Sequence, residues 1–135
     1  MPFSAKRVAV VLSALLLAPA CVTTTPEERA RMERTAAVPV TRSTPDECDA
    51  LWGAAVHWVT QQSRWKIQSQ SDVMLQTYGL RDTTKVAFRL NRIPTGSGGC
   101  RVVLGTSCGN IFGCVPTELS FRVGFVRAFS SSRGF

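Results

Sequence analysis

The apolar residues of this chain change their spacing near Ser63, and that change constrains the fold more than any other feature of the sequence. Before Ser63 they recur every three or four residues, which is the period of one face of an α-helix. After it they alternate with polar residues, which is the period of a strand with one buried face. This order predicts an α+β fold in which one N-terminal amphipathic helix packs on an antiparallel sheet of about four to five strands.

The predicted helix has a clear start in the sequence Thr44-Pro45-Asp46-Glu47. Thr44 can cap the helix, proline suits the first helical position, and Glu47 can complete a capping box. The two acids also lie at the positive end of the helix dipole. We expect this helix to run to about Gln62. Its apolar face comprises Cys48, Leu51, Trp52, Ala55, Val56 and Val59.

Five segments after the helix show the alternation that is typical of strands. They lie at 65–67, 73–77, 86–90, 101–105 and 119–125. Gln70-Ser71-Asp72 predicts a turn between the first two, and a glycine-rich loop at 94–99 separates the third from the fourth. The last segment predicts the longest strand, because Leu119, Phe121, Val123 and Phe125 all fall on one side of it.

The cysteine count points to disulfide bonds. The chain has five cysteines: Cys21, Cys48, Cys100, Cys108 and Cys114. If Cys21 is set apart, the other four predict two disulfides with three possible connectivities, of which we expect Cys108 with Cys114 and Cys48 with Cys100. In the chain-entropy model the short loop would add about 2 kcal/mol and the long one about 4 kcal/mol. Because no CxxC pair or second histidine accompanies these cysteines, no metal site is predicted.

The first twenty residues have the layout of an export signal. Lys6 and Arg7 precede an apolar run at 8–18, and small residues come just before Cys21. The run is shorter than the ~20 residues that a membrane-spanning helix needs, and Pro19 ends it. The sequence therefore predicts a signal peptide at 1–20 that is removed and takes no part in the fold.

The end of this signal, Leu17-Ala18-Pro19-Ala20-Cys21, resembles the lipobox of bacterial envelope lipoproteins. The resemblance implies lipidation of Cys21 and a chain held to a membrane of the cell envelope. Val22 after the cysteine resembles the pattern of lipoproteins that are passed to the outer membrane and face the periplasm. The alternative is ordinary signal-peptidase cleavage after Ala20, which would leave Cys21 as an N-terminal thiol.

The mature chain divides into three parts. Residues 21–42 hold few large apolar side chains and predict a polar tether, although Thr25-Pro26-Glu27-Glu28 could start a short helix through about Met32. We expect a globular α+β domain at 43–129 and a frayed tail at 130–135.

The globular part is similar to small lipoprotein domains of the BamC type. The similarity lies in the order of Ala50-Leu51-Trp52 on a helix, Trp65-Lys66-Ile67 on a strand and Val73-Met74-Leu75-Gln76 on the next. It covers about a third of the chain and rests on element order, so it implies a fold more than a role. Domains of that type are linked with outer-membrane assembly.

The sequence offers no catalytic set. Its one histidine, His57, lies opposite the apolar face of the predicted helix, where we expect it to be exposed. Gly96-Ser97-Gly98-Gly99 lacks the following Lys-Ser or Lys-Thr of a phosphate loop and leads into a strand, so it predicts a turn. We therefore expect a protein that is not an enzyme and needs no cofactor or metal.

Two sets of residues are candidates for binding. Arg89, Arg101 and Arg122 alternate with apolar residues on predicted strands, which would align them on the sheet face opposite the helix. Ile111 and Phe112 lie with Val115 in the loop at 106–116, where exposed apolar side chains would form a protein contact. The alternatives are that the arginines only face water and that the loop folds back onto the core.

Charge adds a preference for the kind of partner. Removing Lys6 and Arg7 with the signal leaves fourteen basic residues against nine acidic ones, a net charge of +5. For an exported chain this charge favours anionic envelope components over nucleic acid, or it serves solubility alone. We predict a membrane-anchored accessory or protein-binding module of the envelope. The alternative is a binder of lipopolysaccharide or cell-wall polymers through a basic sheet face.

Overall fold

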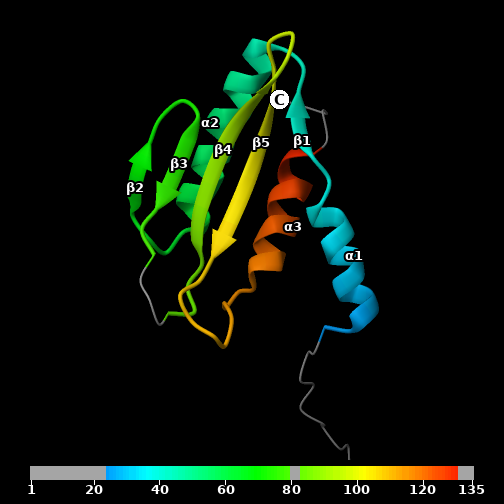
Figure 1. Cartoon of the computed structure of the whole chain (residues 1–135), viewed down its shortest axis with the longest axis vertical. Helices are drawn as coiled ribbons and strands as arrows, with labels where there is room; N and C mark the ends of the chain where they lie inside the picture. The colour runs from blue at the N-terminus through cyan, green and yellow to red at the C-terminus, as the bar shows by residue number, and fades with distance from the viewer. Residues whose placement is uncertain (1–23, 80–82, 131–135) are drawn as a thin grey trace, which may run out of the picture.

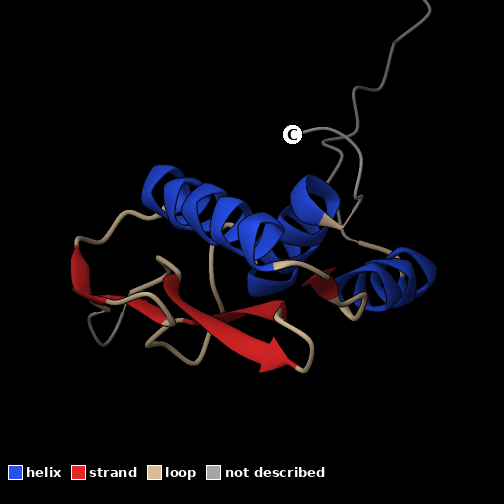
Figure 2. Ribbon diagram, turned by 90° about the horizontal axis from the view of Figure 1, so that it is seen from above, coloured by secondary structure: helices blue, strands red, loops and turns tan. Residues whose placement is uncertain are grey.

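The computed structural model describes residues 24–79 and 83–130, and these form a two-layer α+β fold with a five-stranded antiparallel sheet. The helices are α1 (Pro26–Ala36), α2 (Pro45–Gln62) and α3 (Glu118–Phe129). The strands are β1 (Val40–Arg42), β2 (Ile67–Gln70), β3 (Met74–Thr77), β4 (Ala87–Thr95) and β5 (Gly99–Ser107). Two helices, α2 and α3, cover one face of the sheet, and α1 lies beside its β1 edge (Figure 2). The predicted α+β class and antiparallel sheet are confirmed.

The sheet has the order β1-β5-β4-β3-β2 (Figure 1). β4 and β5 form a long central hairpin in which Leu90 lies opposite Leu104. β1 joins at the outer edge of β5 and spans only three residues, from Val40 opposite Val102 to Arg42 opposite Cys100. Beyond Val102, β5 is therefore paired with β4 alone within the described part of the chain.

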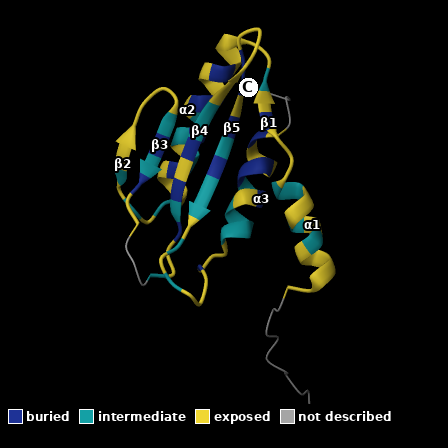
Figure 3. Ribbon diagram, in the orientation of Figure 1, coloured by how far each residue is buried: buried dark blue, intermediate teal, exposed yellow. Residues whose placement is uncertain are grey.

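α2 forms where the sequence predicts it. The hydroxyl oxygen of Thr44 accepts a hydrogen bond from the backbone N–H of Glu47 at 3.3 Å, and the helix ends at Gln62. Its inner face buries Cys48, Leu51, Trp52, Ala55 and Val59. These residues pack with buried side chains of β4 and β5, and Figure 3 shows buried residues on all three elements. The hydrophobic core thus lies between the sheet and the helices α2 and α3.

The predicted strand at 119–125 is wrong, because this segment is part of helix α3. Thr117 caps α3 by accepting a hydrogen bond from the backbone N–H of Ser120 at 3.2 Å. The residues buried along α3 follow the helical spacing of Val123, Val126 and Phe129, and Phe125 is buried beside them. The alternation from Leu119 to Phe125 also matches two apolar stripes of a helix, so periodicity alone did not separate the two structures.

The segment predicted as a tether also differs, because residues 26–36 form α1 and residues 40–42 form the edge strand β1. A full capping box starts α1, with Thr25 and Glu28 each bonded to the other's backbone N–H. The helix extends beyond the predicted end near Met32 and packs against α3. Val40 is buried in β1, so this segment contributes to the core.

Both expected disulfides are present. Cys48–Cys100 joins the first turn of α2 to β5, and Cys108–Cys114 closes the loop before α3. Their Cα–Cα separations of 5.9 and 5.8 Å lie within the usual range for a disulfide.

The predicted signal peptide at 1–20, Cys21 and positions 131–135 of the predicted tail lie outside the described residues. Among the residues that are described, no helix has both the length and the apolar character needed to cross a membrane.

Candidate functional site

The three candidate arginines do not form one patch. Arg89 on β4 and Arg101 on β5 are exposed on the sheet face that no helix covers. Arg101 lies opposite Ile93, four residues along β4 from Arg89, so their backbones are separated by about 14 Å along the strands. Arg122 lies on α3, in the helical layer, because its segment is a helix and not a strand. The expected alignment of all three on one sheet face is therefore wrong.

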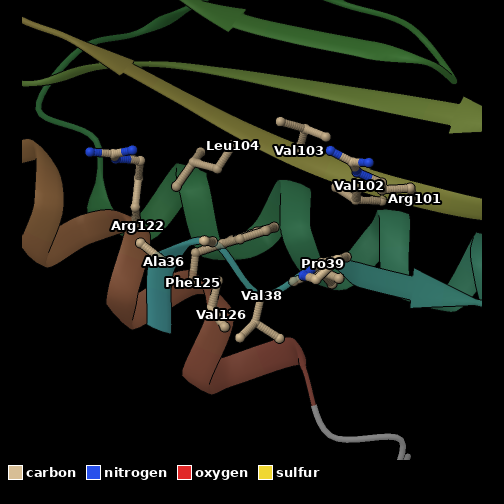
Figure 4. Close-up of a pocket in the computed structure, with 12 residues that line it drawn as sticks. Ala36, Val38, Pro39, Arg101, Val102, Val103, Leu104, Arg122, Phe125 and Val126 are labelled. Atoms are coloured by element: carbon tan, nitrogen blue, oxygen red, sulfur yellow. The ribbon is translucent and has the colours of Figure 1, made fainter. Parts of the chain in front are cut away.

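A groove beside the outer edge of β5 was not predicted. We call it the β5-edge groove, and its volume is about 190 Å³. One wall is the connection at 36–40 between α1 and β1, the other is formed by Arg122, Phe125 and Val126 of α3, and residues 101–104 of β5 line it between them (Figure 4). The groove lies where β1 no longer pairs with β5, since this pairing begins only at Val40 opposite Val102. Neither β1 nor α3 was predicted, so no pattern in the sequence placed these walls together.

The β5-edge groove has an apolar interior with a basic side chain, Arg122, at one end. Leu104, Phe125 and Val126 point into it, and Arg122 and Arg101 lie at opposite sides of the view in Figure 4. No acidic side chain is among the residues that line it. This arrangement suits apolar side chains accompanied by negative charge.

The loop closed by Cys108–Cys114 carries a second apolar surface. Ile111, Phe112 and Val115 are 93%, 91% and 71% exposed, so the loop does not fold back onto the core. Two hydrogen bonds hold its backbone to the segment before β4: the Asn110 side-chain amide donates to the carbonyl of Thr83 at 2.6 Å, and the Val115 N–H donates to the carbonyl of Thr84 at 2.8 Å. The loop therefore presents exposed apolar side chains on a fixed backbone.

A wider concavity of about 800 Å³ lies beside the first half of α2, at the end of the molecule opposite the disulfide-closed loop. Trp52 and Val73 supply apolar surface, and Asp49 forms an ion pair of 2.8 Å with Arg92 across it. Gly53 also lines this concavity. The only acids that line it are Asp72 and the paired Asp49, and no histidine or cysteine thiol accompanies them, so its lining holds no nucleophile and base pair.

His57 is exposed on α2, as predicted, and it lines none of these concavities. Across 24–79 and 83–130, no group of three or more His, Cys, Asp or Glu side chains is placed to hold a metal ion. What the described residues present is an apolar groove, an exposed apolar loop and an uncovered sheet face. The chain matches no family model, no curated protein and no solved structure.

Proposed function

We propose that this chain is a non-enzymatic lipoprotein of the bacterial envelope that is anchored through Cys21 and acts as an accessory, protein-binding module. The lipobox-like sequence at 17–21 supports the anchor. The two disulfides support export, because structural disulfides persist in oxidising compartments and are rare in the cytosol. All four cysteines in the described part are paired with each other, which sets Cys21 apart as the position for a lipid.

The observation that supports a protein partner most directly is the outer edge of β5 at 103–107, which no strand of the described residues pairs with and which lies beside the β5-edge groove. A free strand edge can take an extended segment of another protein by backbone hydrogen bonding, while neighbouring pockets select its side chains. Exposed edges of this kind are usually shortened, charged or covered in proteins that do not use them. Here residues 103–107 extend the edge past β1, and the groove lies beside the start of that stretch.

The chemistry of the groove defines the partner segment. Its volume of about 190 Å³ is below the range of roughly 300–1,000 Å³ for most small-molecule sites. One or two apolar side chains from an extended protein segment match this volume better than a separate ligand. Arg122 adds a preference for a carboxylate beside those apolar residues.

Site-specific photo-crosslinking in intact cells tests this proposal. A crosslinking residue in place of Val38, on the groove wall, should give one discrete adduct with an envelope protein. Arg122→Glu should remove the adduct, because it reverses the charge at one end of the groove. Arg89→Glu is the matched control, since Arg89 carries the same charge on the uncovered sheet face.

The two variants separate the two binding modes. Loss of the adduct in R89E with retention in R122E would move the interface to the sheet face. No adduct at Val38, together with normal envelope assembly after deletion of the protein, would overturn the accessory role.

The uncovered sheet face supports the alternative, binding of an anionic envelope polymer. Arg89 and Arg101, about 14 Å apart, are too distant to hold one phosphate but could contact successive charges of a polymer. This mode predicts binding to lipopolysaccharide or cell-wall fragments that weakens with salt and falls in an R89Q/R101Q double variant. Binding that is independent of salt would exclude it.

The anchor itself is tested by intact mass. Protein purified from membranes should have a mass that begins at Cys21 and includes acyl chains, and reduction of the two disulfides should add four hydrogens. A mass without lipid would show a secreted domain with an N-terminal thiol, and the membrane-anchored function would fall.

A further inference from the structure

We propose that the tip of the disulfide-closed loop, formed by Ile111, Phe112 and Val115, inserts into the surface of the membrane that holds the lipid on Cys21. The loop tip is then a second membrane contact that orients the domain. This inference rests on the proposed lipid anchor and adds an orientation to it.

The loop tip has no structural role that explains its side chains. Ile111 and Phe112 are almost fully exposed, and neither belongs to the hydrophobic core or packs against it. The backbone beneath them is fixed by Cys108–Cys114 and by the bonds of Asn110 and Val115 to the segment before β4. Exposed large apolar side chains on such a support are typical of contact surfaces, and little chain entropy is lost when they are buried.

The path of the chain places the anchor at the same end of the molecule. In Figure 1 the start of α1 and the loop before α3 both lie at the lower end of the long axis, away from the β4–β5 turn. Cys21 precedes Thr24 by three residues, and an extended chain spans at most about 3.6 Å per residue, so the link between the lipid site and Thr24 can be no longer than about 11 Å. A lipid on Cys21 would therefore bring the membrane to the end that carries the loop tip.

Charge beside the loop tip favours an anionic lipid surface. A hollow of about 480 Å³ is lined by Arg64 and Lys85 together with Val115, and none of the described residues that line it is acidic. The Lys85 ammonium also lies 5.8 Å from the centroid of the Trp65 ring, and aromatic rings of this kind are frequent at the level of lipid headgroups. Cations beside an apolar tip match lipid phosphates above acyl chains.

Acidic residues lie toward both ends of the described structure. Asp49 and Asp72 line the concavity at the opposite end, next to the start of α2, where Asp46 and Glu47 also lie. The acids toward the loop end lie in the first turns of α1 and α3: Glu27, Glu28 and Glu118. The attraction to an anionic lipid surface is therefore local to the hollow.

Fluorescence quenching by brominated lipids tests the insertion. The full chain is produced with its signal, purified from membranes, checked by intact mass, and reconstituted into vesicles of phosphatidylcholine and phosphatidylglycerol. Phe112→Trp reports on the loop tip, and Ile93→Trp is the control on the uncovered sheet face. The wild-type signal is subtracted to leave the fluorescence of the added indole. Brominated acyl chains should quench this fluorescence roughly twofold in F112W, consistent with burial near the acyl boundary. They should leave the fluorescence added by I93W unchanged.

Charge variants give a second measurement. Arg64→Gln and Lys85→Gln should each weaken docking of the tip about fivefold in vesicles with phosphatidylglycerol and have little effect in neutral vesicles. The reason is that each removes one attraction to an anionic surface.

The outcomes distinguish this inference from the anchor. A lipidated protein in which the F112W signal is not quenched, or in which both probes are quenched equally, would overturn the loop contact and leave the anchor intact. A crosslink from position 112 to an envelope protein without quenching would assign the tip to a protein partner and overturn the membrane contact. A mass without lipid would overturn both proposals.

Discussion

At the scale of single residues, Thr77 shows how a buried hydroxyl completes the sheet. Thr77 is 3% exposed at the end of β3, and its hydroxyl oxygen accepts a hydrogen bond from the backbone N–H of Phe88 at 2.9 Å. The ladder between β3 and β4 has its last aligned pair at Gln76 and Arg89. The side chain of Thr77 therefore accepts a hydrogen bond from the buried N–H of Phe88, just beyond the end of the β3–β4 ladder.

Replacing Thr77 by valine should destabilise the protein by about 1–3 kcal/mol. Valine keeps the shape of threonine but leaves the Phe88 N–H buried without an acceptor. Thr77→Ser is the control, because it keeps the oxygen and loses only a methyl group. Urea unfolding of both variants is the measurement, and an equal or smaller loss for valine would contradict the role of this hydrogen bond.

Gly53 is a second informative residue, because nothing in the packing of α2 requires a glycine there. A Cβ added at Gly53 would have no heavy atom within 4 Å, whereas one at Gly98 would lie 3.0 Å from Cγ of Pro45 on a backbone with φ of +79°. An alanine substitution is therefore expected to have opposite effects on stability at Gly53 and at Gly98.

Gly53→Ala should stabilise the protein by about 0.5–1 kcal/mol, because alanine loses less entropy in a helix interior. A rise in Tm of roughly 4 °C is the expected readout. Gly98→Ala should instead lower the Tm, because of its positive φ and its contact with Pro45. A lower Tm for Gly53→Ala would show that a glycine is needed at this position.

At the scale of elements, the two disulfides constrain the chain to different degrees. Cys48–Cys100 links α2 to β5 across 52 residues, and Cys108–Cys114 spans 6. The first also lies in the core, where Cys48 and Cys100 are both buried. The second fixes the loop that carries Ile111 and Phe112.

Removing Cys48–Cys100 by paired alanine substitutions should cost about 4 kcal/mol, and removing Cys108–Cys114 about 2 kcal/mol, because a longer loop restricts the unfolded chain more. Urea unfolding of each double variant against the wild type measures both values. Equal losses, or a larger loss for the short loop, would show that native packing outweighs loop closure.

At the scale of the whole molecule, stability should fall from the centre of the fold toward α1. α2 buries five residues against the sheet, whereas α1 buries none and is held by its packing on α3. A helix with so little buried surface can open without unfolding the domain.

Hydrogen exchange should therefore be at least about tenfold faster in the amides of α1 than in those of α2. Exchange followed by mass spectrometry on the intact protein measures this ratio. Equal protection in the two helices would show that α1 unfolds only with the whole domain, as an integral part of it.

The features that could be predicted are those that depend on residues close together in the chain. The cap at Thr44, the length of α2 and the Ser71 turn follow from local hydrogen bonding and from the apolar period of one helix. The cysteine pairing was also predicted correctly. So was the α+β class, because the helical and alternating apolar periods are both local features of the sequence.

The segments that complete the sheet and form the candidate surfaces could not be predicted, because they depend on packing between distant parts of the chain. Val40 is buried because β5 lies beside it, although the segment around it is polar. The run from Leu119 to Phe125 is helical because α3 packs its Phe125 and Phe129 over the sheet, a contact that periodicity cannot show. Arg122 therefore lies at the β5-edge groove and not on the predicted sheet face. The sequence could not show this, because the walls of a groove come from segments distant in the chain.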